Sequence, residues 1–339
     1  MSAMRIGLIG TGRIGAFHAR TLIANPEVTH LTVADQDAER AAATAESLGG
    51  NVTAADAPAG LLAQDLDAVV IASATASHAA LIRAAAERGL PAFCEKPVAL
   101  DMPGTLDALR AVDAAGTLLQ IGFMRRFDPG YEAAREALRA GRLGRLHTVR
   151  AITSDAAPPP AEFLPHSGGL YRDCLVHDFD VLRWVTGREV ETVYAVGSDA
   201  GPPMFHEAGD VGTAAVLLTL DDGTLCTATA TRMNGAGYDV RMELAGEKDQ
   251  LAVGLDARTP LTSTEPSASA AAPAPHESFM SRFEAAYEAE LAAFLRAARG
   301  ETPNPCDGWE ALTALRVAEA CELSRREGRS VRMPEIPAG

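Results

Sequence analysis

Residues 4–15 of the sequence read Met4-Arg5-Ile6-Gly7-Leu8-Ile9-Gly10-Thr11-Gly12-Arg13-Ile14-Gly15. The apolar run Met4–Ile9 predicts a buried strand, and the glycines after it have the spacing G-x-G-x-x-G. In such a turn Gly10 permits the tight bend, Gly12 lets the backbone approach a pyrophosphate, and Gly15 lets a helix pack on the strand. Gly12–Ala24 has helical spacing. The phosphates of a dinucleotide would therefore meet free N–H groups at a helix N-terminus.

A carboxylate stands where a second predicted strand, Leu31–Ala34, ends. Asp35 comes 20 residues after Gly15, where a carboxylate can accept hydrogen bonds from the hydroxyls of an adenosine ribose. Its charge would repel a 2′-phosphate, Asp37 adds to that repulsion, and Arg40 is the cation nearby in sequence. We therefore predict NAD rather than NADP as the cofactor.

Strand and helix signals alternate over the first part of the chain. Each predicted strand is nearly all apolar, which is typical of a parallel sheet covered on both faces. We predict a doubly wound Rossmann domain over residues 1–122. Its strands are expected at Met4–Ile9, Leu31–Ala34, Asn51–Thr53, Ala68–Ala72, Leu90–Cys94 and Leu118–Gly122, and its helices at Gly12–Ala24, Asp37–Leu48, Ser77–Arg88 (with Ser77 as N-cap) and Met102–Ala115.

The pattern changes after Gly122. We predict an α+β domain over residues 123–339, with a large, mostly antiparallel open sheet and flanking helices. Asp221-Asp222-Gly223 is expected to join two strands as a hairpin turn, and Thr262–Ser278 to be an irregular loop. Strands are expected at Leu146–Ile152, Glu191–Val196, Thr213–Leu220, Thr224–Thr231 and Val240–Ala245, and helices at Asp128–Ala140, Gly169–Thr186, Phe279–Arg299 and Trp309–Glu327.

Bulk composition excludes several classes of partner. The net charge of −15 and the pI of about 5.0 argue against binding to nucleic acid or to an anionic membrane surface. The five cysteines are scattered and form no C-x-x-C pair, and no His/Cys/carboxylate spacing resembles a zinc site. No signal peptide and no apolar run of membrane-spanning length is visible. We expect a cytoplasmic protein with reduced thiols, no bound metal and a small-molecule substrate.

Lys96 is the first candidate for chemistry. It lies in Glu95-Lys96-Pro97, directly after the predicted strand Leu90–Cys94. A lysine at a strand end beside a nicotinamide site can donate a hydrogen bond and positive charge to a reacting hydroxyl.

A second candidate group lies in the predicted helix after Gly168-Gly169. Asp173 and His177 are four residues apart, so on a helix they share a face. A histidine can take a proton from a carbinol, and a nearby carboxylate can orient it. Solvated surface pairs have the same spacing, so the spacing alone leaves both interpretations open.

These residues carry a resemblance to the Gfo/Idh/MocA oxidoreductases that covers almost the whole chain. Within that family the chain is most similar to inositol 2-dehydrogenases. The matching stretches are Gly7–Gly15, Ser73–His78, Phe93–Pro97, Gly122–Tyr131, Ser167–Trp184 and Asp307–Val331.

The resemblance implies a triad in which Lys96 donates to the reacting hydroxyl, His177 is the general base, and Asp173 pairs with His177 or binds a substrate hydroxyl. It also implies a homotetramer or homodimer assembled through the faces of the second-domain sheets. The implied cofactor contacts are Gly10, Gly12, Arg13, Ile14, Gly15, Asp35, Ser73, Thr75, His78, Glu95, Lys96 and Arg125. Substrate contacts are expected from Lys96, Arg126, Asp155, His166, Asp173 and His177, with Tyr287 as a further candidate.

The function expected on these grounds is NAD-dependent oxidation of a cyclic polyol, myo-inositol to 2-keto-myo-inositol. The same chemistry on scyllo-inositol or an aldose is an alternative. So are a non-catalytic NAD-binding regulator and a redox-assisted lyase or glycoside hydrolase that recycles its NAD. The sequence leaves the choice of polyol, the epimer and the physiological direction open.

Overall fold

The computed structural model describes residues 3–267 and 274–337, and the chain divides into two compact units. The first unit comprises the described residues up to Met124 together with Tyr287–Leu312. The second comprises Arg125–Ala286 and the described residues from Thr313 onward. Tyr287–Leu312 belongs to the first unit because its apolar side chains complete that unit's core. The functional domain limits 1–122 and 123–339 stay a prediction.

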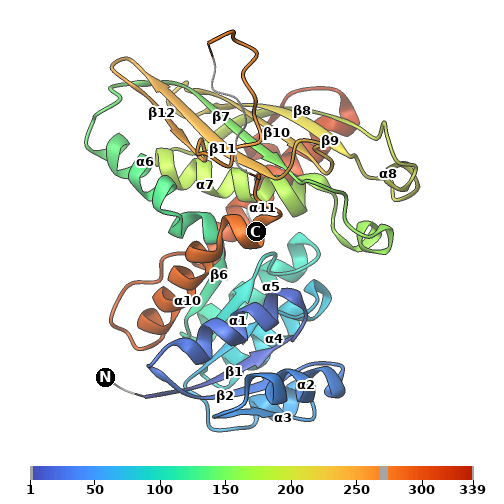
Figure 1. Cartoon of the computed structure of the whole chain (residues 1–339), viewed down its shortest axis with the longest axis vertical. Coiled ribbons are helices and arrows are strands. Elements are labelled where there is room, and N and C mark those ends of the chain that lie inside the picture. The colour runs from blue at the N-terminus through green and yellow to red at the C-terminus, as the bar shows by residue number, and fades with distance from the viewer. Residues whose placement is uncertain (1–2, 268–273, 338–339) are drawn as a thin grey trace. The chain divides into compact units, whose positions relative to one another are not determined.

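The sheet of the first unit has six parallel strands in the order β3-β2-β1-β4-β5-β6. The doubly wound fold expected from the alternating pattern is thereby confirmed. Strands β1, β2 and β6 of this sheet are labelled in Figure 1. Strand order reverses between β1 and β4, and ligands of such sheets bind beyond the carboxyl ends of the strands at that point. The strands are β1 (Met4–Ile9), β2 (Val28–Ala34), β3 (Val52–Ala54), β4 (Ala68–Ile71), β5 (Ala92–Glu95) and β6 (Leu119–Gly122).

Two helices of this unit, α2 and α5, begin after an aspartate whose side chain caps them. Asp37 caps α2 by accepting a hydrogen bond from the Arg40 N–H, and Asp101 caps α5 in the same way. The expected N-cap at Ser77 is wrong: α4 begins two residues earlier, and the Ser77 hydroxyl donates instead to the Ala74 carbonyl. The helices are α1 (Arg13–Ala24), α2 (Ala38–Leu48), α3 (Pro58–Leu62), α4 (Thr75–Glu87), α5 (Met102–Ala115) and, later in the chain, α10 (Glu284–Ala298).

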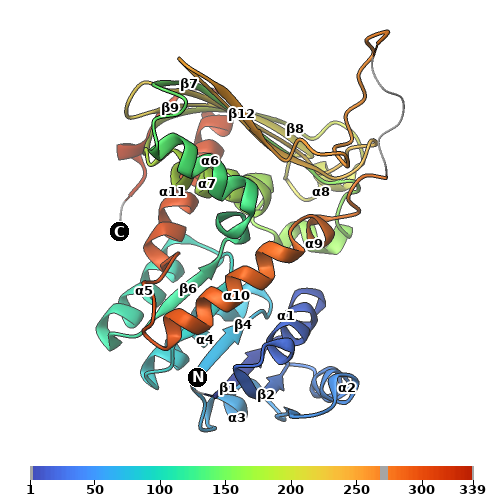
Figure 2. The ribbon, with the colours of Figure 1, turned by 60° about the vertical axis from the view of Figure 1, so that its left-hand side comes forward.

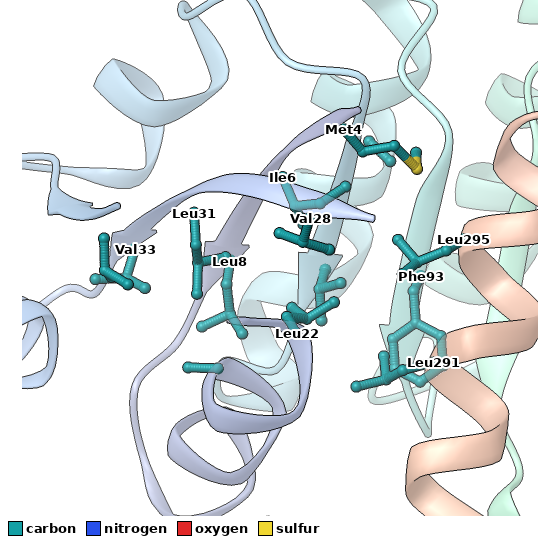
Figure 3. Packing of buried hydrophobic residues seen from close by; sticks show 14 of the residues in the cluster. Met4, Ile6, Leu8, Leu22, Val28, Leu31, Val33, Phe93, Leu291 and Leu295 are labelled. Atoms are coloured by element: carbon teal, nitrogen blue, oxygen red, sulfur yellow. The ribbon is translucent and has the colours of Figure 1, made fainter. Parts of the chain in front are cut away.

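The core of the first unit lies between strands β1 and β2 and helices α1 and α10. Leu22 of α1 and Leu291 and Leu295 of α10 approach the strands in Figure 3. Full burial of each such side chain stabilises the fold by about 1.5–3 kcal/mol. The strand residues of the same buried cluster are Ile6, Leu8, Val28, Leu31, Val33 and Phe93.

The sheet of the second unit has seven strands in the order β12-β11-β7-β10-β9-β8-β13. Strands β7 and β10 run parallel and the other neighbouring pairs run antiparallel, which confirms the expected mostly antiparallel sheet. The hairpin between β9 and β10 also forms as expected. The short edge strands β12 and β13 were not predicted. The strands are β7 (Leu146–Ser154), β8 (Val190–Ser198), β9 (Thr213–Leu220), β10 (Leu225–Thr231), β11 (Asp239–Gly246), β12 (Gln250–Val253) and β13 (Val331–Arg332).

One face of this sheet is covered by α6 (Pro129–Arg139) and α7 (Val176–Thr186), as Figure 2 shows. Side chains of β9 and β10 alternate between buried and exposed positions. The exposed face carries large apolar residues, among them Tyr194 and Leu217, which are cross-strand neighbours.

Two helical predictions for the second half need correction. The predicted helix Phe279–Arg299 is two helices, α9 (Phe279–Arg282) and α10, which are separated at Phe283. The predicted helix Gly169–Thr186 begins instead with a π-helical turn, η3 (Tyr171–Leu175), followed by α7. The remaining elements are η1 (Met124–Phe127), η2 (Ala161–His166), α8 (Met204–Glu207), α11 (Gly308–Glu327) and η4 (Met333–Glu335).

The described parts of Thr262–Ser278 form no helix or strand, in agreement with the prediction of a loop, apart from an isolated bridge between His276 and Tyr238. Residues 268–273 of this loop lie outside the described residues. No helix in the described chain is long and apolar enough to cross a membrane.

Candidate active site

The glycine turn has the geometry that the sequence predicts. Gly10 has a φ of 97°, and a Cβ on it would lie 2.5 Å from the backbone of Ser73 in the loop after β4. A Cβ on Gly15 would overlap the carbonyl oxygen of Gly10. Both glycines are therefore required for the close approach of α1 and the β4 loop to the end of β1.

Gly12 differs from the other two glycines because it faces open space. Apart from Gly12 and its two neighbours in the chain, no described atom lies within 4 Å of the position that a Cβ would take there. Gly12 is also the N-cap of α1 and supplies no capping side chain. The N–H groups of the first turn of α1 can therefore receive a phosphate, so this end of the sheet fits a dinucleotide.

Asp35 follows β2 and is tied to the glycine turn. Its Oδ2 accepts hydrogen bonds from the backbone N–H of Thr11 at 2.7 Å and from the Thr11 hydroxyl at 3.0 Å. Its Oδ1 accepts from the Asp37 N–H at 3.0 Å. Burial opposes ionisation of Asp35, but hydrogen bonds from Asp37 and Thr11, with a smaller contribution from Arg40, outweigh burial and lower its pKa. Asp35 is therefore a fixed negative charge beside the turn.

The other expected cofactor residues of the first unit lie on α1 or on the loops after β4 and β5. Arg13 and Ile14 belong to the first turn of α1. Ser73 follows β4, and its hydroxyl lies 2.6 Å from that of Ser77, while Thr75 is the first residue of α4. These positions lie at the carboxyl edge of the sheet, and direct contacts with the cofactor stay a prediction.

His78 is buried, and both of its ring nitrogens face backbone carbonyl groups. Nδ1 lies 2.7 Å from the Pro97 oxygen and Nε2 lies 2.9 Å from the Ser73 oxygen. His78 thus connects the loop after β4 to the loop that carries Lys96.

Glu95 and Lys96 stand at the end of β5, as expected. The Glu95 carboxylate lies 2.7 Å from Nε2 of His18, a fully buried residue of α1. Gly122 on the neighbouring strand leaves room for this carboxylate, because a Cβ there would approach Glu95 Oε2 to 3.1 Å. Lys96 is half-buried directly after this anchored residue. Tyr287, a candidate substrate contact, is buried against the rings of His18 and Phe17.

In the second unit, Asp173 lies in the π-helical turn η3 and His177 in the first turn of α7. The turn follows Gly168 and Gly169, whose φ values of 81° and 89° are accessible mainly to glycine. The regular helix assumed for the Asp173–His177 pair is therefore interrupted between its two members. Both side chains are half-buried, and π-helical turns are frequent at functional sites.

Arg232 is a neighbour of the candidate residue Asp173 that the sequence analysis missed. It comes directly after β10, and its Nη1 donates to Asp173 Oδ2 at 2.9 Å. The same nitrogen lies 3.5 Å from Cys174 Sγ. The thiol of Cys174 is in turn 3.9 Å from a carboxylate oxygen of Asp155, which follows β7 and was expected to bind substrate. A charged residue immediately after a predicted strand is the signal that could have drawn attention to Arg232.

Arg125 and Arg126 are buried in ion pairs with α7. Arg125 donates to Asp178 at 2.7 Å and to Thr153 at 2.9 Å. Arg126 donates two hydrogen bonds to Asp180, at 2.9 and 2.6 Å. These pairs favour a structural role for both arginines, because they hold the helix that carries His177. Contact of Arg125 with the cofactor and of Arg126 with the substrate stays a prediction.

His166 ends the short helix η2 and is exposed. Its contact with substrate also stays a prediction. Among the described residues, no group of three or more His, Cys, Asp and Glu side chains could hold a metal ion.

Comparison with known proteins agrees with this geometry. Residues 4–123 match the model of an oxidoreductase family with an NAD-binding Rossmann fold, and residues 131–252 match the Gfo/Idh/MocA C-terminal domain. A myo-inositol dehydrogenase, Hyg17, of Streptomyces leeuwenhoekii is 38% identical over 96% of this chain and 98% of its own length. A scyllo-inositol 2-dehydrogenase (NAD(+)) of Bacillus subtilis is 33% identical over 97% of this chain and 96% of its own length.

Among solved structures, a scyllo-inositol dehydrogenase from Lactobacillus casei with bound NAD(H) and scyllo-inositol has a TM-score of 0.88. It is 27% identical and the match covers 98% of this chain and 100% of that one. The fold and the glycine turn thus define an oxidoreductase with an NAD-binding Rossmann domain. The chain belongs to the Gfo/Idh/MocA family and is an oxidoreductase of the inositol 2-dehydrogenase type.

Proposed function

We propose that this protein oxidises a secondary hydroxyl of a cyclic polyol with NAD, and that its substrate is myo-inositol, which becomes 2-keto-myo-inositol. The observation that carries the proposal is the position of Lys96, at the end of β5 on the same sheet edge as the glycine turn. Its neighbour Glu95 is fixed by a buried histidine. In this proposal the Lys96 ammonium lies beside the nicotinamide of the bound dinucleotide.

Each of three residues has a distinct task in this proposal. The Lys96 ammonium donates a hydrogen bond to the reacting hydroxyl and stabilises the alkoxide that develops there. The His177 imidazole removes the hydroxyl proton, and Asp173 orients the imidazole and stabilises its positive charge. NAD, when bound, accepts the hydride from the same carbon.

Further substrate contacts are proposed from Asp155, Arg126 and His166. Support is greatest for Asp155, because it is half-buried and Cys174, the residue after Asp173, is adjacent to it. Its carboxylate could accept a hydrogen bond from a second hydroxyl of the polyol.

A second candidate substrate is scyllo-inositol, since relatives of both specificities match almost the whole chain. The test is to mix the purified protein with myo-inositol, scyllo-inositol and aldoses, each with NAD and with NADP, and to follow the absorbance of the reduced nicotinamide. The proposal expects the highest kcat/KM with myo-inositol and NAD. Faster turnover of an aldose would overturn the choice of substrate, and NAD binding without any turnover would favour a regulator.

We also propose that the chain forms a homotetramer or homodimer through the exposed face of the second-unit sheet. Tyr194, Val196, Leu217 and Leu225 are between 39% and 50% exposed on strands β8, β9 and β10. Leu217→Lys should lower the mass measured by light scattering, whereas Leu100→Lys, at an exposed leucine of the first unit, should leave it unchanged. A monomeric unaltered protein would contradict this proposal.

We further propose a cytoplasmic setting for the protein. All five cysteines, each within the described chain, lie outside disulfides, which supports this setting.

A further inference from the structure

Arg232 is a buried cation in contact with two carboxylates. Its side chain is 2% exposed, and its guanidinium donates to Asp173 at 2.9 Å and to Asp210 at 3.5 Å. Asp173 lies in the π-helical turn, and Asp210 lies in the loop that precedes β9. A guanidinium suits this place because its donors diverge in a fixed plane and can serve two acceptors at once.

Asp210 is itself bonded to the beginning of the turn. Its Oδ1 accepts hydrogen bonds from the backbone N–H groups of Leu170, at 3.0 Å, and Val211, at 2.8 Å. Gly169 leaves space for this carboxylate, because a Cβ there would approach Asp210 Oδ1 to 3.2 Å. Through Asp210 and Asp173, Arg232 is therefore connected to both the start and the middle of the turn.

Burial of the three groups makes this arrangement sensitive to loss of the cation. Burial opposes the charged form of Arg232, but Cys174, Asp173 and Asp210 outweigh it and raise the pKa of the guanidinium. Removing Arg232 would leave Asp173 and Asp210 close together with no positive charge between them. The repulsion between the two carboxylates and the loss of the guanidinium donors would displace Asp173.

We propose that Arg232 is a positioning residue for the dehydrogenase reaction, which it serves by holding the Asp173 carboxylate in the orientation that His177 requires. This inference rests on the proposed function, because it assigns a role through Asp173. It goes further because it gives the reaction a residue that follows β10, outside the turn and helix that carry Asp173 and His177.

The experiment compares Arg232→Lys and Arg232→Gln with matched variants of Arg183. Arg183 is also buried and donates two hydrogen bonds to a carboxylate, that of Glu189, at 2.7 Å each. It lies at the far end of α7, away from Asp173. For every variant, kcat, the KM values for polyol and NAD, and the thermal midpoint are measured.

We expect Arg232→Gln to lower kcat by roughly 100-fold, because a small displacement of a catalytic group has an effect of that order. The kcat of Arg232→Lys should be about tenfold higher than that of Arg232→Gln, because lysine restores the positive charge but not the diverging donors of the guanidinium. The KM for NAD should remain within about twofold of its original value. Arg183→Gln should lower the thermal midpoint and leave kcat unchanged.

A double-mutant cycle separates positioning from a merely structural role. If Arg232 acts through Asp173, adding Arg232→Gln to Asp173→Asn should lower kcat by less than about threefold more. The inference would be overturned if Arg232→Gln lowered kcat by the same factor in the Asp173→Asn protein as in the unaltered protein. Full kcat in a folded Arg232→Gln protein would also overturn it. If the unaltered protein oxidises no polyol, the proposed function fails. The positioning role is then tested by a crystal structure of the Arg232→Gln protein, and an unmoved Asp173 in that structure would reject it.

Discussion

The imidazole of His18 lies 2.7 Å from the carboxylate of Glu95, and the histidine is fully buried. His18 is in the second turn of the helix that begins at the glycine turn, and Glu95 is the residue before Lys96. The element that would receive the phosphates is thus bonded directly to the segment that carries the proposed catalytic amine.

Replacing His18 by phenylalanine tests the importance of this bond. The ring volume is kept, but the Glu95 carboxylate loses its buried donor, so the free energy of unfolding should fall by about 1–3 kcal/mol. Urea denaturation measures the change. The matched variant His206→Phe, at an exposed histidine paired with Asp199, should leave the denaturation midpoint almost unchanged. Equal midpoints for both variants would show that the buried contact adds no stability.

The two glycines of the turn should respond differently to a methyl group. Gly15→Ala forces a Cβ against the Gly10 carbonyl, so it should destabilise the protein without ligand by about 1–3 kcal/mol or more. The Cβ added by Gly12→Ala points into open space, and Gly12 has an ordinary φ of −65°. The free energy of unfolding of this variant should therefore be nearly unchanged. Its NAD affinity should nevertheless fall, because the methyl group lies where the pyrophosphate would approach. Calorimetric titration with NAD and thermal unfolding distinguish the two variants, and unimpaired NAD binding by Gly12→Ala would place the cofactor elsewhere.

Asp35→Asn should weaken discrimination against NADP. The amide keeps an oxygen for the Thr11 N–H but loses the charge that repels a 2′-phosphate. The ratio of kcat/KM for NADP to that for NAD should rise roughly tenfold, equivalent to about 1.4 kcal/mol of binding. Asp35→Ala, which also loses the bonds to Thr11, should in addition lower kcat/KM for NAD. A preference for NADP in the unaltered protein would contradict this account of Asp35.

The depressed pKa of Asp35 fixes the pH range of this preference. Its folded-state pKa lies below the ordinary 3.8, so the carboxylate is charged throughout the range from about pH 5 to 9. Its contribution to stability is present above the unfolded-state pKa and is lost as the pH falls through the lower, folded-state value. Cofactor preference measured between about pH 6 and 9 should therefore be constant, and a preference that changes across neutral pH would implicate another group.

Variants of the proposed catalytic residues should separate binding from chemistry. Lys96→Ala should lower kcat by about 10²–10³-fold through loss of a donor to the alkoxide. His177→Ala should lower it by about 10²–10⁴-fold through loss of the base. Fluorescence titration should show that both variants still bind NAD. Retained turnover would remove the residue concerned from the mechanism, and an unchanged pH–rate profile in a His177 variant would reject it as the base.

The elements best predicted from sequence are those with local signals. α5 has its predicted limits because Asp101 caps its first turn and Gly116, in a left-handed conformation, ends it. The parallel strands were recognised from apolar runs that are buried on both faces. The edge strand β13 escaped prediction because its two residues carry no periodicity. The edge strand β12 is as long as β5, but only its last residue is buried, so it lacks the features of a buried strand.

The candidate site residues, too, could be predicted where a local sequence pattern marks them. Gly10, Gly15 and Asp35 could be assigned because spacing along one strand–helix–strand unit fixes where they lie. The ion pairs of Arg125 with Asp178 and of Arg126 with Asp180 join residues 53 and 54 positions apart, so no local pattern announces them. The contact of Arg232 with Asp173 spans 59 positions and was missed for the same reason.

Transfer of a labelled hydrogen tests the central claim most directly. The unaltered protein is incubated with NAD and with myo-inositol that carries deuterium on all six ring carbons, and the reduced nicotinamide is analysed by mass spectrometry and NMR. We expect one deuterium per molecule of reduced cofactor, at C4 of the nicotinamide ring. Reduced cofactor without deuterium, or none formed from any inositol, would contradict the account.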